Sequence, residues 1–324
     1  MNYSILFLIL FISVCIASMI VGILVLLNNR KAPANKCLFA LTVAITIWSV
    51  GLGFATAASD IVTSEIWRRV SSFGWGTAFA MILHLLLIIT GRDTLLKKRW
   101  FRLLLYLPAV LCIFAFTIPS GLNEIPYYLH RTKFGWVNVP VNNFWDWLFY
   151  VYYVVYTVLG LALLLQWGRK SSDRNIKMQS RAIFWSFMVT LALASITDVL
   201  ISDIPQMAPI IILLPIVVTY RTMIKYGFIM TEPTEKKSRF LFIVVIIILY
   251  VILIFLQIRL TTVASMFRLG ILDGYTLRGI ITQLQMLLSI YMVLKEDKAG
   301  FIAAVLINVS TFLTSLSQIF HSRS

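Results

Sequence analysis

The sequence predicts an all-α fold, a polytopic transmembrane helix bundle of about ten spans. Hydrophobic residues make up 60% of the chain and charged residues 13%, so a water-soluble globule would leave too much apolar surface uncovered. Apolar runs alternate with short polar breaks, and each run has about the 20 residues that a helix needs to cross a bilayer core. The short alternating segments of a membrane β-barrel are absent from the sequence.

The apolar runs place the expected helices in order along the chain. Their boundaries follow from where each run meets Lys, Arg, Pro or Asn, and each carries an uncertainty of a few residues. The expected spans are 5–27, 37–58, 71–91, 102–118, 144–167, 182–201, 208–228, 240–258, 275–294 and 299–320.

The distribution of basic residues predicts an extracytoplasmic N-terminus. If Met1 lies outside, 20 of the 28 Lys and Arg residues fall in the inside segments, as the positive-inside rule requires. The sequence therefore predicts a multi-pass protein of the cell membrane with its N-terminus outside.

We expect three regions: a seven-span module at 1–228, a cytoplasmic linker at 229–239 and a further membrane block of about three spans at 240–324. The long outside segment 119–147 is rich in Pro, Gly and aromatic residues, which predicts turns over the mouth of the bundle. Ten spans leave Ser324 outside, so we expect any cytoplasmic output to lie beyond further spans, in a longer chain or on a partner.

Charge and motif content exclude several functional classes. The formal charge of +15 is divided among short clusters beside the apolar runs, which fits anionic lipid headgroups and not nucleic acid. No phosphate-binding loop, dinucleotide fingerprint, zinc motif or nucleophile elbow occurs, and the three cysteines have no metal-binding spacing. The sequence therefore predicts no catalytic residue, no metal site and no cofactor.

Residues 38–93 and 178–204 resemble a known family. Trp48 lies near the middle of the second span, the pair Trp67 and Arg68 precedes the expected third span, and Gly74 opens it. The later stretch "MQSRAIFWSFMVTLALASITDVLISDI" carries Asp198 near the outer end of the sixth span. Together these features resemble the N-terminal seven-span (7TM) region of membrane-bound sensor histidine kinases and diguanylate cyclases of bacteria, over residues 1–228.

The resemblance implies a sensory input module that perceives an extracytoplasmic or intramembrane cue. It implies a kinase or cyclase output domain, in cis or in trans, as a partner. We also expect membrane lipids, a small ligand at the outer face and a second copy of the chain as partners. No phosphoacceptor helix, nucleotide-binding segment or Gly-Gly-Asp-Glu-Phe motif follows the seven spans, so neither activity is expected in this chain. A small-solute transporter or channel component, or a membrane-embedded enzyme acting on lipid, stays open as an alternative.

The fifth span suggests a ligand-binding wall. Eight residues of "FWDWLFYVYYVVY" are aromatic, and Trp145, Phe149, Tyr152 and Tyr156 would share one helix face. An aromatic belt at the headgroups explains the first turns, but Tyr152 and Tyr156 lie deeper and need partners for their hydroxyls. Either these rings pack in the bundle or they line a pocket.

Asp198 is the acidic residue placed deepest in any expected span. Either it is hydrated or caps the sixth helix at the outer interface, or it is the polar anchor of an outward-open cavity. Arg68 and Arg69, at the mouth of the third span, offer it an ion pair as a further alternative. The predicted ligand site lies beneath the 119–147 loop and consists of Asp198, Trp145, Tyr152, Tyr156 and Arg68.

Small residues and prolines predict the helix contacts. Small residues four positions apart on a helix permit close packing against a neighbouring helix. The second span has such residues at Ser49, Gly53 and Ala57, and the third has them at Gly74 and Ala78. Pro108, Pro209 and Pro215 are expected to kink their helices. For His84, within the third span, we expect either an interhelical hydrogen bond or a proton or metal role.

Overall fold

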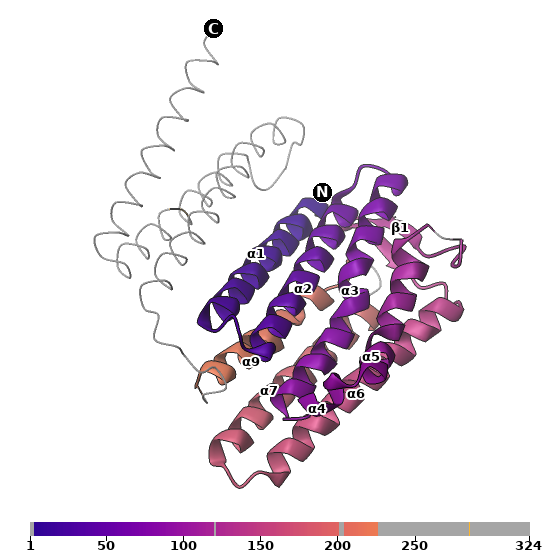
Figure 1. The fold of residues 1–324 in the computed structure, drawn as a ribbon. Helices are drawn as coiled ribbons and strands as arrows, with labels where there is room; N and C mark the ends of the chain where they lie inside the picture. Colours follow the sequence, from indigo (N-terminus) through magenta and orange to yellow (C-terminus); the bar gives the residue numbers. More distant parts are fainter. Residues whose placement is uncertain (1–2, 120, 201–203, 226–284, 286–324) are drawn as a thin grey trace. The chain divides into compact units, whose positions relative to one another are not determined.

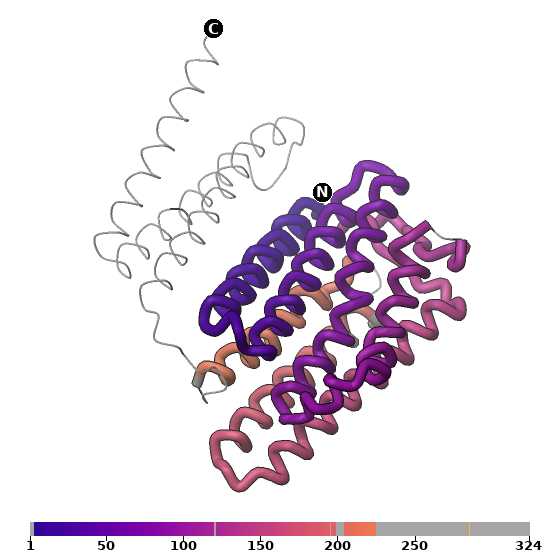
Figure 2. Tube along the Cα trace, viewed as in Figure 1, coloured from indigo at the N-terminus to yellow at the C-terminus, as the bar shows by residue number. Residues whose placement is uncertain are grey.

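The computed structural model describes residues 3–119, 121–200, 204–225 and Gln285 (Figures 1 and 2). The chain divides into two compact units, of which the larger comprises Asn2–Glu232. The linker 229–239 and the three spans expected at 240–258, 275–294 and 299–320 lie outside the described residues. The count of ten spans and the three-region division therefore stay predictions.

The described part of the chain is mostly helical, as an all-α membrane bundle requires. Six of its helices are long and apolar enough to cross a membrane, and a shorter apolar helix follows at Ala208–Ile224. In chain order the helical elements are α1 (Ser4–Asn28), α2 (Pro33–Ala57), α3 (Ile61–Ile89), α4 (Asp93–Lys97), α5 (Arg99–Cys112) with η1 (Ile113–Thr117), α6 (Phe144–Lys170), α7 (Arg174–Ser195) with η2 (Ile196–Leu200), α8 (Ala208–Ile211) and α9 (Leu213–Lys225).

Helix α3 begins ten residues before the start predicted from hydropathy. Asp60 is its N-cap, and the side chain accepts a hydrogen bond from the Thr63 backbone N–H at 2.9 Å. Trp67 and Arg68 were expected ahead of this helix, and that prediction is wrong because the Asp60 cap starts the helix before the apolar run begins. Helix α7 likewise begins at Arg174, eight residues before the expected position.

The segment between η1 and α6 contains a β-hairpin where only turns were expected. Strand β1 (Tyr128–Thr132) pairs antiparallel with β2 (Gly135–Val139), so the fold is not helical throughout. Gly135 has φ +118°, a conformation that residues with a Cβ rarely adopt, and it lets the chain reverse next to the backbone of Thr56.

The hairpin is attached to the ends of the first two helices. The Tyr3 N–H donates to the Lys133 carbonyl at 3.1 Å, and Trp136 Nε1 donates to the Ala58 carbonyl at 3.0 Å. The hairpin therefore lies at the same end of the bundle as the start of α1 (Figure 1).

Helices α1, α2 and α3 pack side by side and bury the largest apolar cluster, as Figure 2 shows in indigo and violet. Gly74 of α3 lies against α2, where an added Cβ would meet the Trp48 backbone nitrogen at 2.5 Å. Gly53 of α2 lies against α1, where an added Cβ would meet the Phe11 Cβ at 3.0 Å. These contacts confirm the close packing predicted for both glycines.

The seventh helix is broken between α8 and α9, one turn before Pro215, as predicted for that proline. Pro209 instead lies in the first turn of α8, and α5 continues as a helix through Pro108. Pro215 has no N–H to donate to the Ile211 carbonyl, and α8 ends at Ile211. Thr190 Oγ1 of α7 donates to that carbonyl at 3.3 Å. The side chain of a neighbouring helix thus supplies the hydrogen bond that the proline removes.

We expect Asp60→Ala to destabilise the bundle more at neutral pH than in acid. The hydrogen bond from the Thr63 backbone holds the pKa of Asp60 below its ordinary value, with smaller contributions from the Thr63 and Ser59 hydroxyls. The cap therefore contributes its full stabilisation at pH values above about 4, the pKa of Asp60 in the unfolded chain. This stabilisation is lost as the pH falls through the lower pKa that Asp60 has in the folded protein. The measurement is the Tm of both proteins in nanodiscs between pH 7 and pH 3. Asp60→Asn, which caps without titrating, is the control, and a gap between wild type and Asp60→Ala that does not change with pH would contradict the prediction.

Candidate functional site

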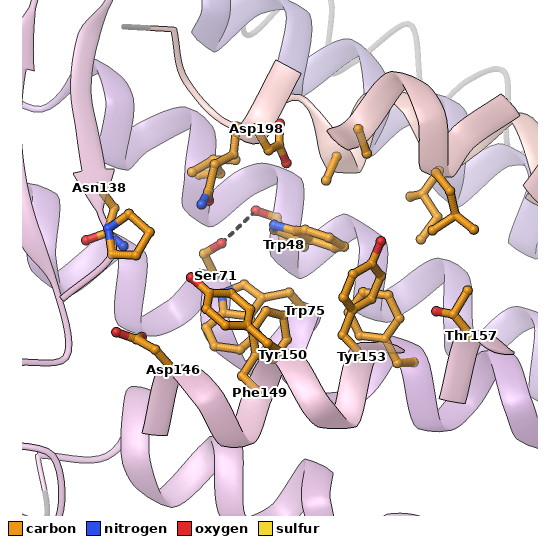
Figure 3. A pocket seen from close by; sticks show the side chains of 18 of the residues that line it. Trp48, Ser71, Trp75, Asn138, Asp146, Phe149, Tyr150, Tyr153, Thr157 and Asp198 are labelled. Carbon is orange, nitrogen blue, oxygen red and sulfur yellow. Dashed lines mark hydrogen bonds between the residues drawn. The ribbon is translucent and has the colours of Figure 1, made fainter. Parts of the chain in front are cut away.

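A cavity of about 630 Å³ lies beneath the hairpin, within the bundle. Its walls come from α2, α3, η1, β2, α6, α7 with η2, and α8, so segments far apart in sequence meet there. The volume falls in the range of small-molecule pockets in proteins. Figure 3 shows Tyr150 and Tyr153 of α6 on one side and Asp198 on the other, with Trp48 between them.

Helix α6 lines the cavity with one face. Asp146, Phe149, Tyr153, Tyr156 and Gly160 recur at spacings of three and four residues, which places them on one side of the helix. Of the predicted aromatic face, Phe149 and Tyr156 belong to this set, whereas Trp145 and Tyr152 do not line the cavity.

Tyr152 is buried against α3, with 3% of its surface exposed. Its hydroxyl accepts a hydrogen bond from the Ala80 N–H at 2.8 Å and donates one to the Gly76 carbonyl at 3.1 Å. In a regular helix these two backbone groups would bond each other, so the Tyr152 hydroxyl is inserted into the ladder of α3. The Tyr156 hydroxyl donates to the Leu105 carbonyl of α5 at 2.9 Å. Both hydroxyls have the partners within the bundle that their depth led us to expect.

Trp145 also serves to join segments of the chain. Its Nε1 donates to the Leu122 carbonyl at 2.8 Å, which attaches the first turn of α6 to the loop after η1. Next to it, Asp146 forms a capping box with Asn143 and lines the cavity. Asp146 was not predicted as a site residue, although the spacing of Asn143 and Asp146 is that of a helix cap.

Asp198 lines the cavity and bonds a neighbouring turn. Its Oδ1 accepts the Met207 N–H at 2.8 Å and the Thr197 hydroxyl at 2.9 Å. Met207 is the N-cap residue of α8, so the carboxylate joins the end of α7 to the start of the broken seventh helix. Asp198 thus bonds the start of the seventh helix, not the sixth helix that it was expected to cap, and it also lines the cavity.

Arg68 is buried, with 3% of its surface exposed, and lines the cavity from α3. Its Nη2 donates to the Trp136 carbonyl of the hairpin at 3.0 Å. Its neighbour Arg69 pairs with Glu65, with 2.7 Å between Nη2 and Oε1. Among the described residues neither arginine forms an ion pair with Asp198, so the structure does not support that alternative.

Tyr127 connects the loop to the same wall. Its hydroxyl donates to the carbonyls of Phe116 at 3.1 Å and Arg68 at 3.3 Å. Burial raises the pKa of Tyr127 above its ordinary range, so the hydroxyl keeps its proton and stays a donor.

His84 forms the interhelical contact expected for a packed histidine. Its Nδ1 lies 2.6 Å from the Tyr106 hydroxyl of α5. Within the described ranges no group of three His, Cys, Asp or Glu side chains is arranged to hold a metal ion.

Comparison with known proteins identifies the family. The profile of the N-terminal 7TM region of histidine kinase matches residues 9–233, more than two thirds of the chain. The chain belongs to this family. A search of curated proteins finds no match.

The 7TM region of histidine kinases is a membrane sensory input region and not a catalytic domain. The match covers the helices and the hairpin that enclose the cavity. Most of the residues that carried the resemblance lie at or beside this cavity, although Trp67 does not line it. Trp48, Arg68 and Asp198 all line the cavity, and Gly74 forms the close contact between α2 and α3 beside it.

Proposed function

We propose that the chain perceives an extracytoplasmic or intramembrane cue in the cavity beneath the hairpin and regulates a cytoplasmic kinase or diguanylate cyclase, in cis or in trans. The observation that carries this proposal is that the 7TM sensory region spans the helices around a cavity of ligand size. In this proposal Asp198, Tyr156 and Arg68 face the ligand, while Trp145 and Tyr152 hold the walls in place.

Two hydrogen bonds offer a path from the cavity to the output. Asp198 bonds the start of α8, and Thr190 bonds the Ile211 carbonyl at the break between α8 and α9. Both residues also line the cavity. A ligand that displaces either side chain changes the support of α9, the last described helix before the proposed linker 229–239.

The test uses the bacterium that carries the gene. Parent, in-frame deletion and complemented strains are compared for phosphohistidine on sensor kinases and for cyclic di-GMP. We expect at least one signal to change on deletion and to return on complementation. Unchanged signals combined with altered uptake of a small solute would favour the transporter alternative.

We further propose that the hairpin end of the bundle faces outward. The connections 29–32, 90–98 and 171–173 at the opposite end carry or adjoin most of the basic residues of the seven helices. We expect alkaline phosphatase fused near Asn123 to be active and the same enzyme fused after Ser172 to be inactive. The opposite pattern would invert the proposed orientation, and immunoblots of both fusions control for expression.

A further inference from the structure

The two carboxylates of the cavity already have hydrogen-bond donors. Asp146 belongs to the capping box at the start of α6, where Asn143 N–H donates to its Oδ2 at 3.4 Å. Asp198 accepts from the Met207 N–H and the Thr197 hydroxyl. Hydrogen bonds to backbone amides and the adjacent helix N-terminus stabilise the charge of a carboxylate. Both acids therefore have hydrogen-bond donors before any ligand binds.

Two buried donors in the same cavity have no partner. Arg68 is 3% exposed and Trp48 is 6% exposed, and both line the cavity. Among the described residues neither Arg68 Nε nor Trp48 Nε1 has a hydrogen-bond acceptor. An unsatisfied buried donor costs about 1 to 3 kcal/mol, and more where it carries charge.

The two donors come from adjacent parts of one wall. Ser71 Oγ donates to the Trp48 carbonyl at 3.1 Å, and Arg68 lies one helical turn before Ser71 on α3. No carboxylate of the described residues forms an ion pair with Arg68. This part of the wall therefore lacks a hydrogen-bond acceptor. A negatively charged acceptor is favoured, because the Arg68 guanidinium is charged and buried.

Below this wall the cavity is apolar and elongated. Trp75, Phe79, Ile82 and Leu86 continue the lining face of α3 away from the hairpin. From Ser71 to Leu86 the helix rises about 22 Å at 1.5 Å per residue, long enough for an extended acyl chain. Figure 3 shows the rings of Trp75 and Phe149 forming part of this floor.

We propose that the cavity binds an anionic amphiphile, whose oxyanion lies at the wall formed by Arg68 and Trp48 and whose apolar part lies along α3 toward Leu86. This inference rests on the proposed use of the cavity as a ligand site. An anionic head group is favoured over a cationic one, because Asp146 and Asp198 accept hydrogen bonds within the protein while Arg68 has no carboxylate partner among the described residues.

The first test varies the head group on one apolar chain. The full chain in nanodiscs of zwitterionic lipid is titrated with decanoate, decan-1-ol and decylamine, and binding is followed by tryptophan fluorescence with empty nanodiscs as the blank. We expect decanoate to bind at least about tenfold more tightly than decylamine, with the alcohol between them. Decylamine binding as tightly as decanoate would overturn the proposal.

The oxyanion can belong to a free fatty acid or to an anionic phospholipid. Repeating the decanoate titration in nanodiscs that contain phosphatidylglycerol separates the two sources. A weaker apparent affinity shows competition by the lipid, and an unchanged affinity assigns the site to the free acid. Either result supports an anionic amphiphile only if decanoate is preferred in the first test.

Matched variants locate the binding. Arg68→Gln is expected to weaken decanoate binding at least about tenfold and Trp48→Phe about threefold to tenfold. Arg69→Gln and Trp67→Phe are the controls, because Arg69 pairs with Glu65 and Trp67 stacks on Phe54 at 4.7 Å, and neither lines the cavity. Equal affinity in Trp48→Phe and Trp67→Phe would contradict the proposed contact.

The outcomes separate this inference from the proposed function. Should Arg68→Gln fail to fold, Trp48→Phe and the head-group series in the unaltered chain still decide the question. Head-group preference for decanoate with no signalling change in the deletion strain leaves the site intact and refutes the sensory role. A signalling change without carboxylate preference refutes the ligand class alone.

Discussion

Replacing Gly74 by alanine should lower the free energy of unfolding by about 2 to 3 kcal/mol, because the overpacked helix pair must separate. The added Cβ would lie 2.5 Å from the Trp48 backbone nitrogen and 2.8 Å from the Trp48 Cβ. Backbone atoms cannot rotate away as a flexible side chain can, so α2 and α3 have to move apart along their shared contact. The measurement is reversible unfolding of the purified chain in mixed micelles.

Gly76→Ala is the matched control for this prediction. The substitution is the same and lies on the same helix, but the nearest atom to the added Cβ is the Cys112 Cβ at 3.4 Å, an ordinary contact. We expect the free energy of unfolding to change by no more than about 1 kcal/mol, since alanine also has a higher helix propensity than glycine. Equal losses in the two variants would show that the contact between α2 and α3 is not the cause.

Filling the cavity should abolish the response of the module. Thr157 lines the cavity from α6, and Figure 3 shows it beyond Tyr153 on the same helix. A tryptophan at this position occupies space that the proposed ligand needs. We expect a strain complemented with Thr157→Trp to show the phosphohistidine and cyclic di-GMP levels of the deletion strain, with normal protein in the membrane.

Val158→Trp is the control, because Val158 is the next residue on α6 and is 58% exposed on the outer surface of the bundle. It adds the same ring to the same helix without entering the cavity. We expect this strain to respond as the wild type does. A full response from Thr157→Trp, at normal expression, would remove the cavity from the proposed mechanism.

The helices were predictable from sequence because the bilayer requires long apolar runs, whereas their ends were not. Asp60 extends α3 through a side-chain bond to Thr63, a local contact that a hydropathy average does not register. The hairpin was missed because its strands are short and its reversal depends on the conformation of Gly135. The start of α3 and the hairpin therefore depend on single residues, Asp60 and Gly135, whose effect a hydropathy average does not include.

The aromatic residues of α6 show why periodicity alone did not define the site. Eight aromatic side chains in thirteen residues place rings on every side of the helix, so the helical period allows more than one apolar face. Contact with Gly76 and Ala80 turns Tyr152 into α3, and that leaves Phe149, Tyr153 and Tyr156 to face the cavity.

The membrane class, the places of the first six spans, the kink at Pro215 and the family resemblance could all be predicted from the sequence. These follow from apolar length, proline chemistry and motifs that lie within one segment. Folding brought Trp48, Arg68 and Asp198 to one cavity and left Trp48 Nε1 and Arg68 Nε without acceptors among the described residues. Whether a polar atom is satisfied depends on which distant segments come within hydrogen-bond distance, and a linear sequence does not record that distance.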